Sequence, residues 1–298
     1  MIKELILLTG GNGQLGCTFS EVFNSSGLIK GYELQAVDIE DINFLNREEI
    51  NTALSFYAPS VIVNCGAYTA VDQAEKDFEL VEKINGEAVA DMAEWARKEK
   101  SRLIQVSTDF VFDGAKRTPY LPSDLTNPLG VYGKTKLKGE KYILDKLPHH
   151  GVVIRTSWLY SEFCSNFVKS MLDLMSEKNE LRIVSDQLGS PTSTHSLVEV
   201  LFKIIDNKSV SGIFHWCDGG EISWFDFAIE IQEQAFELGI LEDQVPIRAI
   251  DTSAYPTLAR RPAYSVLDRR MTIDELRINE TIWKNELRKV IAKIASAG

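Results

Sequence analysis

Tyr132 and Lys136 stand at positions i and i+4 of the stretch from Pro128 to Glu140. The turn at Pro128 and the apolar residues that recur after Lys136 predict a helix that begins just before Tyr132. Such positions share one face of a helix, so the phenol and the ammonium should meet. A cation favours the phenolate, so we expect Lys136 to lower the pKa of Tyr132 from its ordinary value of about 10. The pair could then exchange a proton near neutral pH, although the same spacing also occurs on many solvated helices.

A third candidate, Thr108, follows a predicted buried strand over residues 102–106 and precedes Tyr132. A hydroxyl at a strand end and a phenol at the start of the next helix could flank one carbonyl oxygen. Carbonyl reduction needs such groups, because the oxygen must be polarised and then protonated as hydride arrives. The three side chains together predict a reductase, with a turn role as the alternative for Thr108.

A glycine-rich segment near the N-terminus could bind a dinucleotide. Residues 5–8 form a continuous apolar run, typical of a buried parallel strand, and lead into glycines at positions 10, 13 and 16. Residues 17–23 can continue as a helix. Glycine permits a close approach of the backbone to a ligand, and the first N–H groups of a helix bind pyrophosphate. A glycine-rich turn without a ligand is the alternative.

Asp38 ends the next predicted strand, residues 34–37. It stands at the distance from the glycines where an acidic side chain binds the adenosine ribose. A carboxylate there mildly favours NADH over NADPH, because it would repel a 2′-phosphate. A role as a helix or loop cap is an equally good interpretation of Asp38.

Further strands at residues 60–64 and 102–106 alternate with helical patterns at residues 46–57 and 78–99. This alternation predicts an α/β fold with a Rossmann-type doubly wound parallel sheet. Ligands of such sheets bind beyond the carboxyl ends of the strands. We therefore expect convergence, in one crevice, of Gly10, Asp38, Ala67 and Thr108.

The pattern changes in the second half of the chain. Helical patterns follow at residues 167–175, 197–205, 223–238 and 282–294. A late sheet strand is predicted at residues 212–216. We predict a dinucleotide-binding domain of residues 1–157 with about 195–220, and a smaller discontinuous substrate-binding domain of residues 158–194 with 221–298.

Composition excludes some classes of partner. The chain has 298 residues, 44% of them hydrophobic and 25% charged, as in an ordinary globular protein. Its net charge of −11 argues against nucleic acid, and no apolar run approaches the ~20 residues needed to cross a membrane. The 4 cysteines and 4 histidines show neither a metal spacing nor a disulfide pattern. We expect a reduced, cytoplasmic protein without a metal.

Several motifs, spread over nearly the whole chain, have a familiar pattern. They occupy residues 9–16, 67–75, 107–114, 132–140, 155–158, 166–168, 186–192 and 261–262. On these segments the chain resembles the extended short-chain dehydrogenase/reductase superfamily and, within it, the dTDP-4-dehydrorhamnose reductases. The segments Val-Asp-Gln-Ala-Glu, Arg-Thr-Ser-Trp and Asp-Gln-x-Gly-x-Pro-Thr are the ones more specific to the rhamnose branch.

The resemblance implies reduction of the C4 ketone of dTDP-4-dehydro-β-L-rhamnose by NADPH or NADH, which gives dTDP-β-L-rhamnose for cell-surface polysaccharide. It implies that Tyr132 protonates the C4 oxygen, Thr108 holds it, and Lys136 binds the nicotinamide ribose. Besides Tyr132 and Lys136, the cofactor contacts implied are Gly10, Gly13, Gln14, Leu15, Asp38, Asn43, Ala67 and Tyr68. Besides Thr108 and Tyr132, the substrate contacts implied are Asp109, Trp158, Asn166, Gln187 and Arg261.

Trp158 offers an apolar face for a deoxysugar, and Arg261 offers a positive fork for a diphosphate. Their ordinary alternatives are a core tryptophan and a surface ion pair. Where some family members bind a divalent ion between subunits through glutamates, this chain has Thr18 and His195. An ion-bridged dimer is therefore not expected, and a monomer or a homodimer both stay open. Asn43 replaces an expected aspartate near the adenine, which leaves the cofactor preference open.

Two other functions stay open. One is reduction, epimerisation or dehydration of another nucleotide sugar, although Phe110 after Asp109, in place of a second acidic residue, disfavours a dehydratase. The other is a non-catalytic regulatory subunit of the methionine adenosyltransferase type. The intact set of Thr108, Tyr132 and Lys136 disfavours that role.

Overall fold

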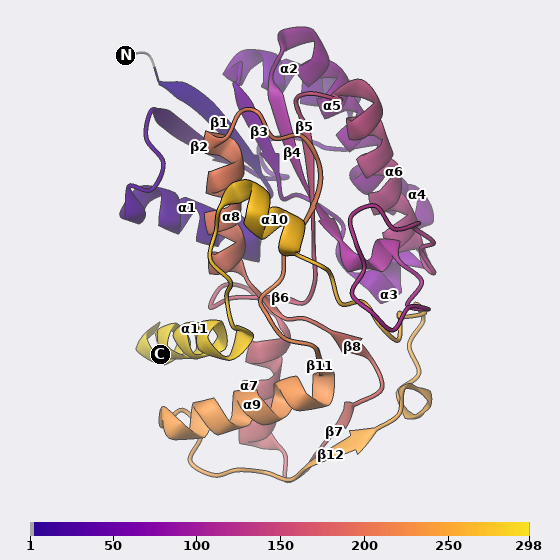
Figure 1. Cartoon of the computed structure of the whole chain (residues 1–298), viewed down its shortest axis with the longest axis vertical. Helices are drawn as coiled ribbons and strands as arrows, with labels where there is room; N and C mark the ends of the chain where they lie inside the picture. The colour runs from indigo at the N-terminus through magenta and orange to yellow at the C-terminus, as the bar shows by residue number, and fades with distance from the viewer. Residues whose placement is uncertain (1–2, 298) are drawn as a thin grey trace.

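A six-stranded parallel sheet lies at the centre of the computed structural model, which describes residues 3–297 (Figure 1). Its strand order is β10-β5-β4-β3-β1-β2. The strands are β1 (Glu4–Thr9), β2 (Tyr32–Val37), β3 (Val61–Asn64), β4 (Arg102–Thr108), β5 (Gly151–Thr156) and β10 (Gly212–His215). The order reverses between β1 and β3, which confirms the predicted doubly wound sheet. Such a reversal opens a crevice at the carboxyl ends of the strands.

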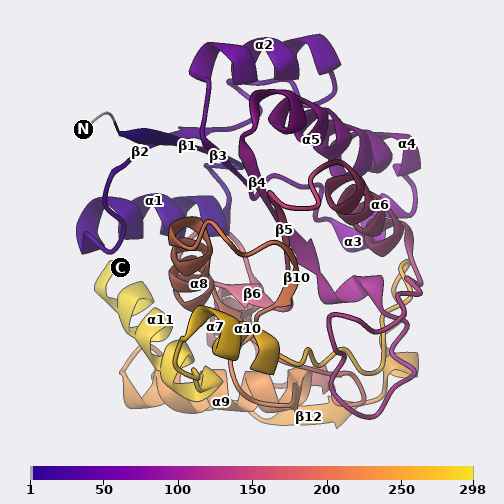
Figure 2. The same ribbon diagram turned by 45° about the horizontal axis from the view of Figure 1, so that its top comes forward.

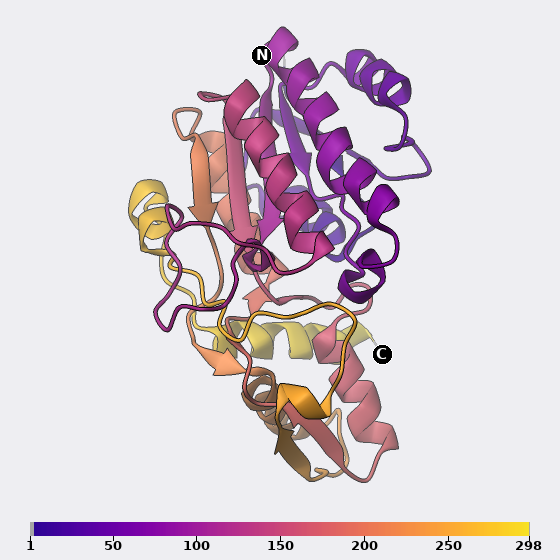
Figure 3. The ribbon, with the colours of Figure 1, turned by 90° about the vertical axis from the view of Figure 1, so that its right-hand side faces the viewer.

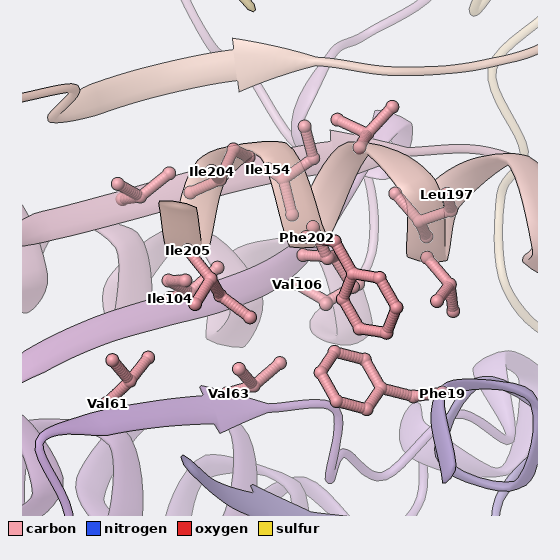
Figure 4. Close-up of a cluster of buried hydrophobic side chains, with 14 of the residues drawn as sticks. Phe19, Val61, Val63, Ile104, Val106, Ile154, Leu197, Phe202, Ile204 and Ile205 are labelled. Atoms are coloured by element: carbon pink, nitrogen blue, oxygen red, sulfur yellow. The ribbon is translucent and has the colours of Figure 1, made fainter. Parts of the chain in front are cut away.

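Helices cover both faces of the sheet, because its strands are apolar on both sides. One face carries α1 (Gln14–Ser26) and α8 (Thr194–Asp206), and the other carries α2 (Arg47–Tyr57), α5 (Ala88–Glu99) and α6 (Val131–Lys146) (Figure 2). On the first face, the rings of Phe19 and Phe202 meet edge to face with centroids 4.8 Å apart. They close the core over Val63 and Val106 of the sheet (Figure 4).

Local sequence signals explain where several helices begin. The side chain of Asn46 accepts hydrogen bonds from the N–H groups of Glu48 and Glu49, so it caps α2 at the predicted start. Helix α6 begins at Val131, which confirms the start predicted just before Tyr132.

The helix predicted at residues 78–99 consists of α4 (Phe78–Glu82), a π-helical turn (Lys83–Glu87) and α5. The π turn contains Asn85, whose side chain accepts from the N–H of Tyr68 at 2.9 Å and donates to its carbonyl at 3.1 Å. The irregular turn therefore fixes the segment that follows β3.

A second group of elements lies beyond the carboxyl ends of the strands (Figure 3). It contains α7 (Phe167–Glu177), α9 (Trp224–Glu237), α11 (Trp283–Ala297) and the parallel pair β7 (Leu181–Val184) and β12 (Ile247–Ile250). These elements share a separate core, which includes Tyr160, Met171, Phe227, Leu287 and Ile291. The strand predicted at residues 212–216 joins the main sheet beside β5, as expected. The predicted domain boundaries stay a proposal.

The remaining elements are short. They are α3 (Val71–Ala74), β6 (Leu159–Tyr160), β8 (Leu188–Gly189), β9 (Thr192–Ser193), β11 (Ile222–Ser223), α10 (Arg270–Leu276) and two 3-10 turns, Asp109–Val111 and Thr252–Ala254. None of the helices within residues 3–297 has both the length and the apolar character that crossing a membrane requires.

Candidate active site

A cleft of about 830 Å³ opens at the carboxyl ends of the central strands. Its walls include Gly10 after β1, Asp38 after β2, Ala67 after β3 and Thr108 at the end of β4. The predicted convergence of these four residues is therefore confirmed. Tyr132 and other predicted site residues also line the cleft, namely Gly13, Gln14, Leu15, Asp109, Lys136, Trp158 and Arg261.

The Thr108 hydroxyl lies next to the Tyr132 phenol in the cleft. Thr108 also donates to Oδ1 of Asp109 at 3.1 Å and accepts from the N–H of Phe110 at 3.1 Å. Helix α6 can come this close because Gly133 packs on the carbonyl of Phe110, where an added Cβ would lie 2.2 Å from the oxygen. The fold thus places both hydroxyl groups side by side at one wall of the cleft.

Burial raises the pKa of Tyr132 to about 12; the adjacent Thr108 hydroxyl opposes this rise, and the charge of Asp109 adds to it. The predicted lowering of this pKa by Lys136 is therefore wrong. Desolvation of the phenol disfavours the phenolate and is the largest cause of the shift. Tyr132 is consequently protonated at neutral pH.

Lys136 lies one helical turn after Tyr132 and is buried, with 4% of its surface exposed. Its ammonium donates to the carbonyl of Val106 at 2.7 Å. Burial lowers the pKa of Lys136 to about 8, although the charges of Glu140 and Cys65 oppose this effect. The ammonium is thus close to its titration range at neutral pH.

Asp109 adds a carboxyl group next to the two hydroxyls. Burial raises its pKa to about 6, and hydrogen bonds from Ser265 and Thr108 oppose the rise. Its Oδ2 is buried and has no hydrogen-bond partner among the described residues. A buried acceptor of this kind needs a donor, which a ligand hydroxyl in the cleft can provide.

The glycine-rich loop has the shape of a phosphate cradle. Gly10 has a φ of +70°, and an added Cβ there would lie 2.6 Å from the backbone nitrogen of Gly66. Gly13 is the N-cap of α1, and no side chain within the described residues caps that helix end. The first N–H groups of α1 are therefore available to an anion, as the pyrophosphate of a dinucleotide requires. These residues fit NAD(P).

The end of the cleft beside β2 is acidic. The carboxylate of Asp38 accepts from the N–H groups of Asn12 at 2.7 Å and Ile39 at 2.8 Å. The side chain of Asn12 donates to Glu40 at 3.3 Å. Asn12 and Glu40 both line the cleft, and the sequence alone did not single them out.

The opposite part of the cleft carries two tryptophans. Trp158 has a φ of +47° and leans on Gly189, where an added Cβ would lie 2.7 Å from the indole. Trp224 is the first residue of α9 and stacks on Trp158. Sequence reasoning missed Trp224, although its place directly after the predicted helix start at Ser223 was a usable signal.

Arg261 lines the cleft while bonded to Asp72. Its Nη2 donates to Oδ2 of Asp72 at 2.9 Å, and its Nε is buried without a partner among the described residues. Asp72 also accepts from the N–H of Ala259 at 2.9 Å. This pair holds the guanidinium at the cleft wall, with donors left for a ligand.

Two predicted substrate contacts lie outside the cleft wall. Asn166 caps α7: it accepts from the N–H of Lys169 at 3.2 Å and donates to the carbonyl of Ser161 at 2.8 Å. Gln187 donates to the hydroxyl of Thr252 at 3.0 Å. Both side chains thus have structural partners, and their contact with substrate stays a prediction.

Two predicted cofactor contacts are also outside the residues that line the cleft. Asn43 is exposed and accepts from the N–H of Leu45 at 3.1 Å. The phenol of Tyr68 donates to Asp77 at 2.7 Å. Their roles in cofactor binding stay predictions.

Away from the cleft, Glu21, Glu162 and His195 offer ligand atoms that all lie within 4.8 Å of one another. The sequence suggested no such cluster. The ammonium of Lys293 donates to Glu162 at 2.9 Å and to Glu21 at 3.1 Å, so a cation of the chain already pairs with both carboxylates. The burial of Glu162 raises its pKa, but hydrogen bonds from His195 and Lys293 outweigh burial and lower it to about 2.

Comparisons with known proteins show which proteins this chain resembles. The sequence profile of the RmlD substrate binding domain matches residues 4–296. The chain is 37% identical to a dTDP-4-dehydrorhamnose reductase of Aggregatibacter actinomycetemcomitans, over 96% of this chain and 98% of that protein. The crystal structure of a dTDP-4-dehydrorhamnose reductase from Clostridium acetobutylicum superposes with a TM-score of 0.90 at 36% identity, covering 98% of this chain and 99% of that one. The enzyme of that name from Bacillus anthracis, in complex with NADP, gives a TM-score of 0.90 at 30% identity, with 98% and 99% coverage.

Proposed function

Because the chain belongs to the RmlD substrate binding domain family, we propose that it is an NAD(P)H-dependent reductase of dTDP-4-dehydro-β-L-rhamnose. The product is dTDP-β-L-rhamnose, a building block for cell-surface polysaccharide. The observation that carries the proposal is the placement of the Thr108 hydroxyl next to the Tyr132 phenol, in a cleft that also contains a dinucleotide cradle.

The chain would hold the cofactor along the strand ends. The N–H groups at the start of α1 would bind the pyrophosphate, Asp38 the adenosine ribose, and Lys136 the nicotinamide ribose. When bound, NAD(P)H supplies the hydride. The buried ammonium of Lys136 also adds positive charge beside the reacting oxygen, where a negative charge develops.

Tyr132 would give the proton to the C4 oxygen. Burial keeps its phenol protonated at neutral pH, so the residue enters the reaction as an acid. Thr108 would hold the same oxygen through its hydroxyl and polarise the carbonyl. The charge of Lys136 then stabilises the phenolate that remains after proton transfer.

The remaining walls suit a deoxysugar diphosphate. The stacked indoles of Trp158 and Trp224 offer an apolar surface to a sugar that carries a methyl group. The Oδ2 of Asp109 can accept a hydrogen bond from a sugar hydroxyl, and the guanidinium of Arg261 can bind phosphate oxygens. Each of these substrate contacts is a proposal.

The test follows the oxidation of NADH and NADPH with enzymatically prepared dTDP-4-dehydrorhamnose. We expect oxidation with this substrate and much slower oxidation with 4-keto nucleotide sugars of other configuration. If the protein binds cofactor tightly but oxidises none with this sugar, the proposed substrate is wrong. The Tyr132→Phe variant serves as the negative control, because it keeps the cleft but lacks the phenol proposed to donate the proton.

We also propose a cytoplasmic location. The four cysteines, Cys17, Cys65, Cys164 and Cys217, are free thiols, as is usual in a reducing compartment. A monomer or a homodimer stays a prediction, which light scattering of the purified protein tests directly.

A further inference from the structure

Two thiols meet beside the glycine-rich loop. Cys17, in the first turn of α1, points its thiol at the carbonyl of Gly11, with the sulfur 3.6 Å from the oxygen. Cys164, which follows β6, donates to the next carbonyl along the loop, that of Asn12, at 3.3 Å. The two sulfurs therefore rest on consecutive peptide groups, although 147 positions separate them in the sequence (164 − 17). Burial raises the pKa of Cys17, and the adjacent Cys164 raises it further.

The segment that carries Cys164 is held from both sides. Before it, Glu162 binds His195 and Lys293, and after it Asn166 caps α7 and donates to the carbonyl of Ser161. Cys164 itself has a φ of +53°, a left-handed conformation that directs its side chain back toward the loop. These anchors keep the thiol next to Cys17 rather than leaving it on a free loop.

The pair is open to small oxidants. Cys164 is exposed and Cys17 is half-buried. A hollow of about 580 Å³ beside the cleft is lined by Cys17, together with Asn12, Asp38 and Phe163. By contrast Cys217 is buried, with its thiol on the carbonyl of Leu267.

We propose that Cys17 and Cys164 form a reversible disulfide across the glycine-rich loop when the protein meets a peroxide, and that this bond weakens cofactor binding. Hydrogen peroxide first oxidises the exposed thiol of Cys164 to a sulfenic acid and is reduced to water. The sulfur of Cys17 then attacks the sulfenic sulfur, the S–S bond forms, and a second water leaves with the proton of Cys17. The two thiols lose two electrons and the peroxide gains them, and a dithiol reductant reverses the change.

The disulfide would hinder binding of the cofactor at the glycine-rich loop. The bond would tie α1 to the segment after β6, directly over the carbonyls of Gly11 and Asn12. The N–H of Asn12 donates a hydrogen bond to Asp38, the residue proposed to bind the adenosine ribose. A disulfide that displaces the loop at Asn12 would therefore also displace Asp38. This part of the inference rests on the proposed function, whereas formation of the bond does not.

The experiment treats the full-length protein with hydrogen peroxide and digests it without reduction. Mass spectrometry should find a peptide pair linked through Cys17 and Cys164, and a titration of NADH fluorescence should show a Kd raised at least about tenfold. Dithiothreitol should remove the link and restore the Kd. The variants Cys17→Ser and Cys164→Ser should each lose both the link and the response of the Kd to peroxide.

A peroxide-treated wild-type protein without this linked pair would overturn the proposal, as would oxidation of Cys164 that stops at a sulfinic acid. A link that forms while the Kd for NADH stays unchanged overturns the proposed effect on binding. Neither readout uses the sugar substrate. A protein that forms the link but does not reduce dTDP-4-dehydrorhamnose would therefore contradict only the proposed reaction.

Discussion

The indole rings of Trp158 and Trp224 stack face to face, with centroids 3.6 Å apart and planes 12° apart. Trp158 follows β5 and Trp224 begins α9, so the contact joins the central sheet to the second group of elements. Two stacked indoles form a rigid apolar plate, because each ring restricts the other. The plate lies in the same cleft as Thr108 and Tyr132.

Replacing Trp224 with Ala should weaken substrate binding through the loss of this plate. We expect the KM for the sugar nucleotide to rise about tenfold or more, because an aromatic contact of this size contributes a kilocalorie or more per mole. The Kd for NADH should change little, since Trp224 belongs to the other end of the cleft. Trp224→Phe keeps an aromatic ring and is the control. An unchanged KM in Trp224→Ala would show that the stacked indoles do not contribute to substrate binding.

Replacing Tyr132 with Phe removes the proposed acid. We expect kcat to fall by about 10²- to 10⁴-fold, the usual contribution of a general acid, while NADH still binds. Tyr142→Phe makes the same change on the same helix outside the residues that line the cleft, so its kcat should match the wild type. Near-normal turnover in Tyr132→Phe would show that another group donates the proton.

The pH dependence of kcat/KM should show the deprotonation of Lys136. Burial lowers the pKa of this lysine from 10.5 to about 8, so the ammonium is present below that pH and is lost above it. If the ammonium binds the nicotinamide ribose, kcat/KM for NADH should fall above pH 8 by about tenfold per pH unit. NADH should be varied at each pH, at constant ionic strength and with the sugar nucleotide at a saturating concentration. A rate that stays level to pH 10 would contradict a role for the Lys136 charge.

Replacing Glu140 with Ala should destabilise the fold. Glu140 and Arg155 form a buried ion pair with Nη2 and Oε2 2.6 Å apart and side chains 1% and 2% exposed. Removing the carboxylate leaves Arg155 buried without its counter-ion, which costs about 3–5 kcal/mol in comparable cases. Urea unfolding measures the loss. Glu237→Ala breaks an exposed pair with Arg288 and should leave the midpoint almost unchanged.

Replacing Asp38 with Ser should shift the cofactor preference toward NADPH. The end of the cleft beside β2 contains Asp38 and Glu40, and a 2′-phosphate would lie against their charges. We expect the ratio of kcat/KM for NADPH over NADH to rise about tenfold. Asp145→Ser, an exposed change on α6, is the matched control and should leave the ratio as it is. If Asp38→Ser leaves the ratio of kcat/KM for NADPH over NADH unchanged, the 2′ position of the adenosine ribose does not lie next to Asp38.

The sequence predicted those parts of the site that depend on neighbours along the chain. Thr108 follows an apolar strand and Tyr132 begins a helix, and both positions can be derived from local patterns. The rule that ligands bind at the carboxyl ends of parallel strands then brings them to one cleft. No further information was needed for this much.

Contacts between distant segments could not be derived in the same way. The stack of Trp158 on Trp224 and the meeting of Cys17 with Cys164 depend on how the second group of elements packs against the sheet. The direction of the pKa shift of Tyr132 was predicted wrongly for a related reason. Helical spacing indicates that Lys136 is near, but desolvation depends on everything that surrounds the phenol.

The core beneath the second group of elements draws on both ends of a long stretch of chain, from Tyr160 to Ile291. During synthesis on the ribosome, the strands from β1 to β5 are made well before Leu287 and Ile291 of α11 exist. A nascent chain can therefore assemble most of its sheet early, while the tryptophan side of the cleft is completed only after α11 has been synthesised. A premature stop before Trp283 would release a protein with a cradle for the dinucleotide but an unfinished wall for the sugar.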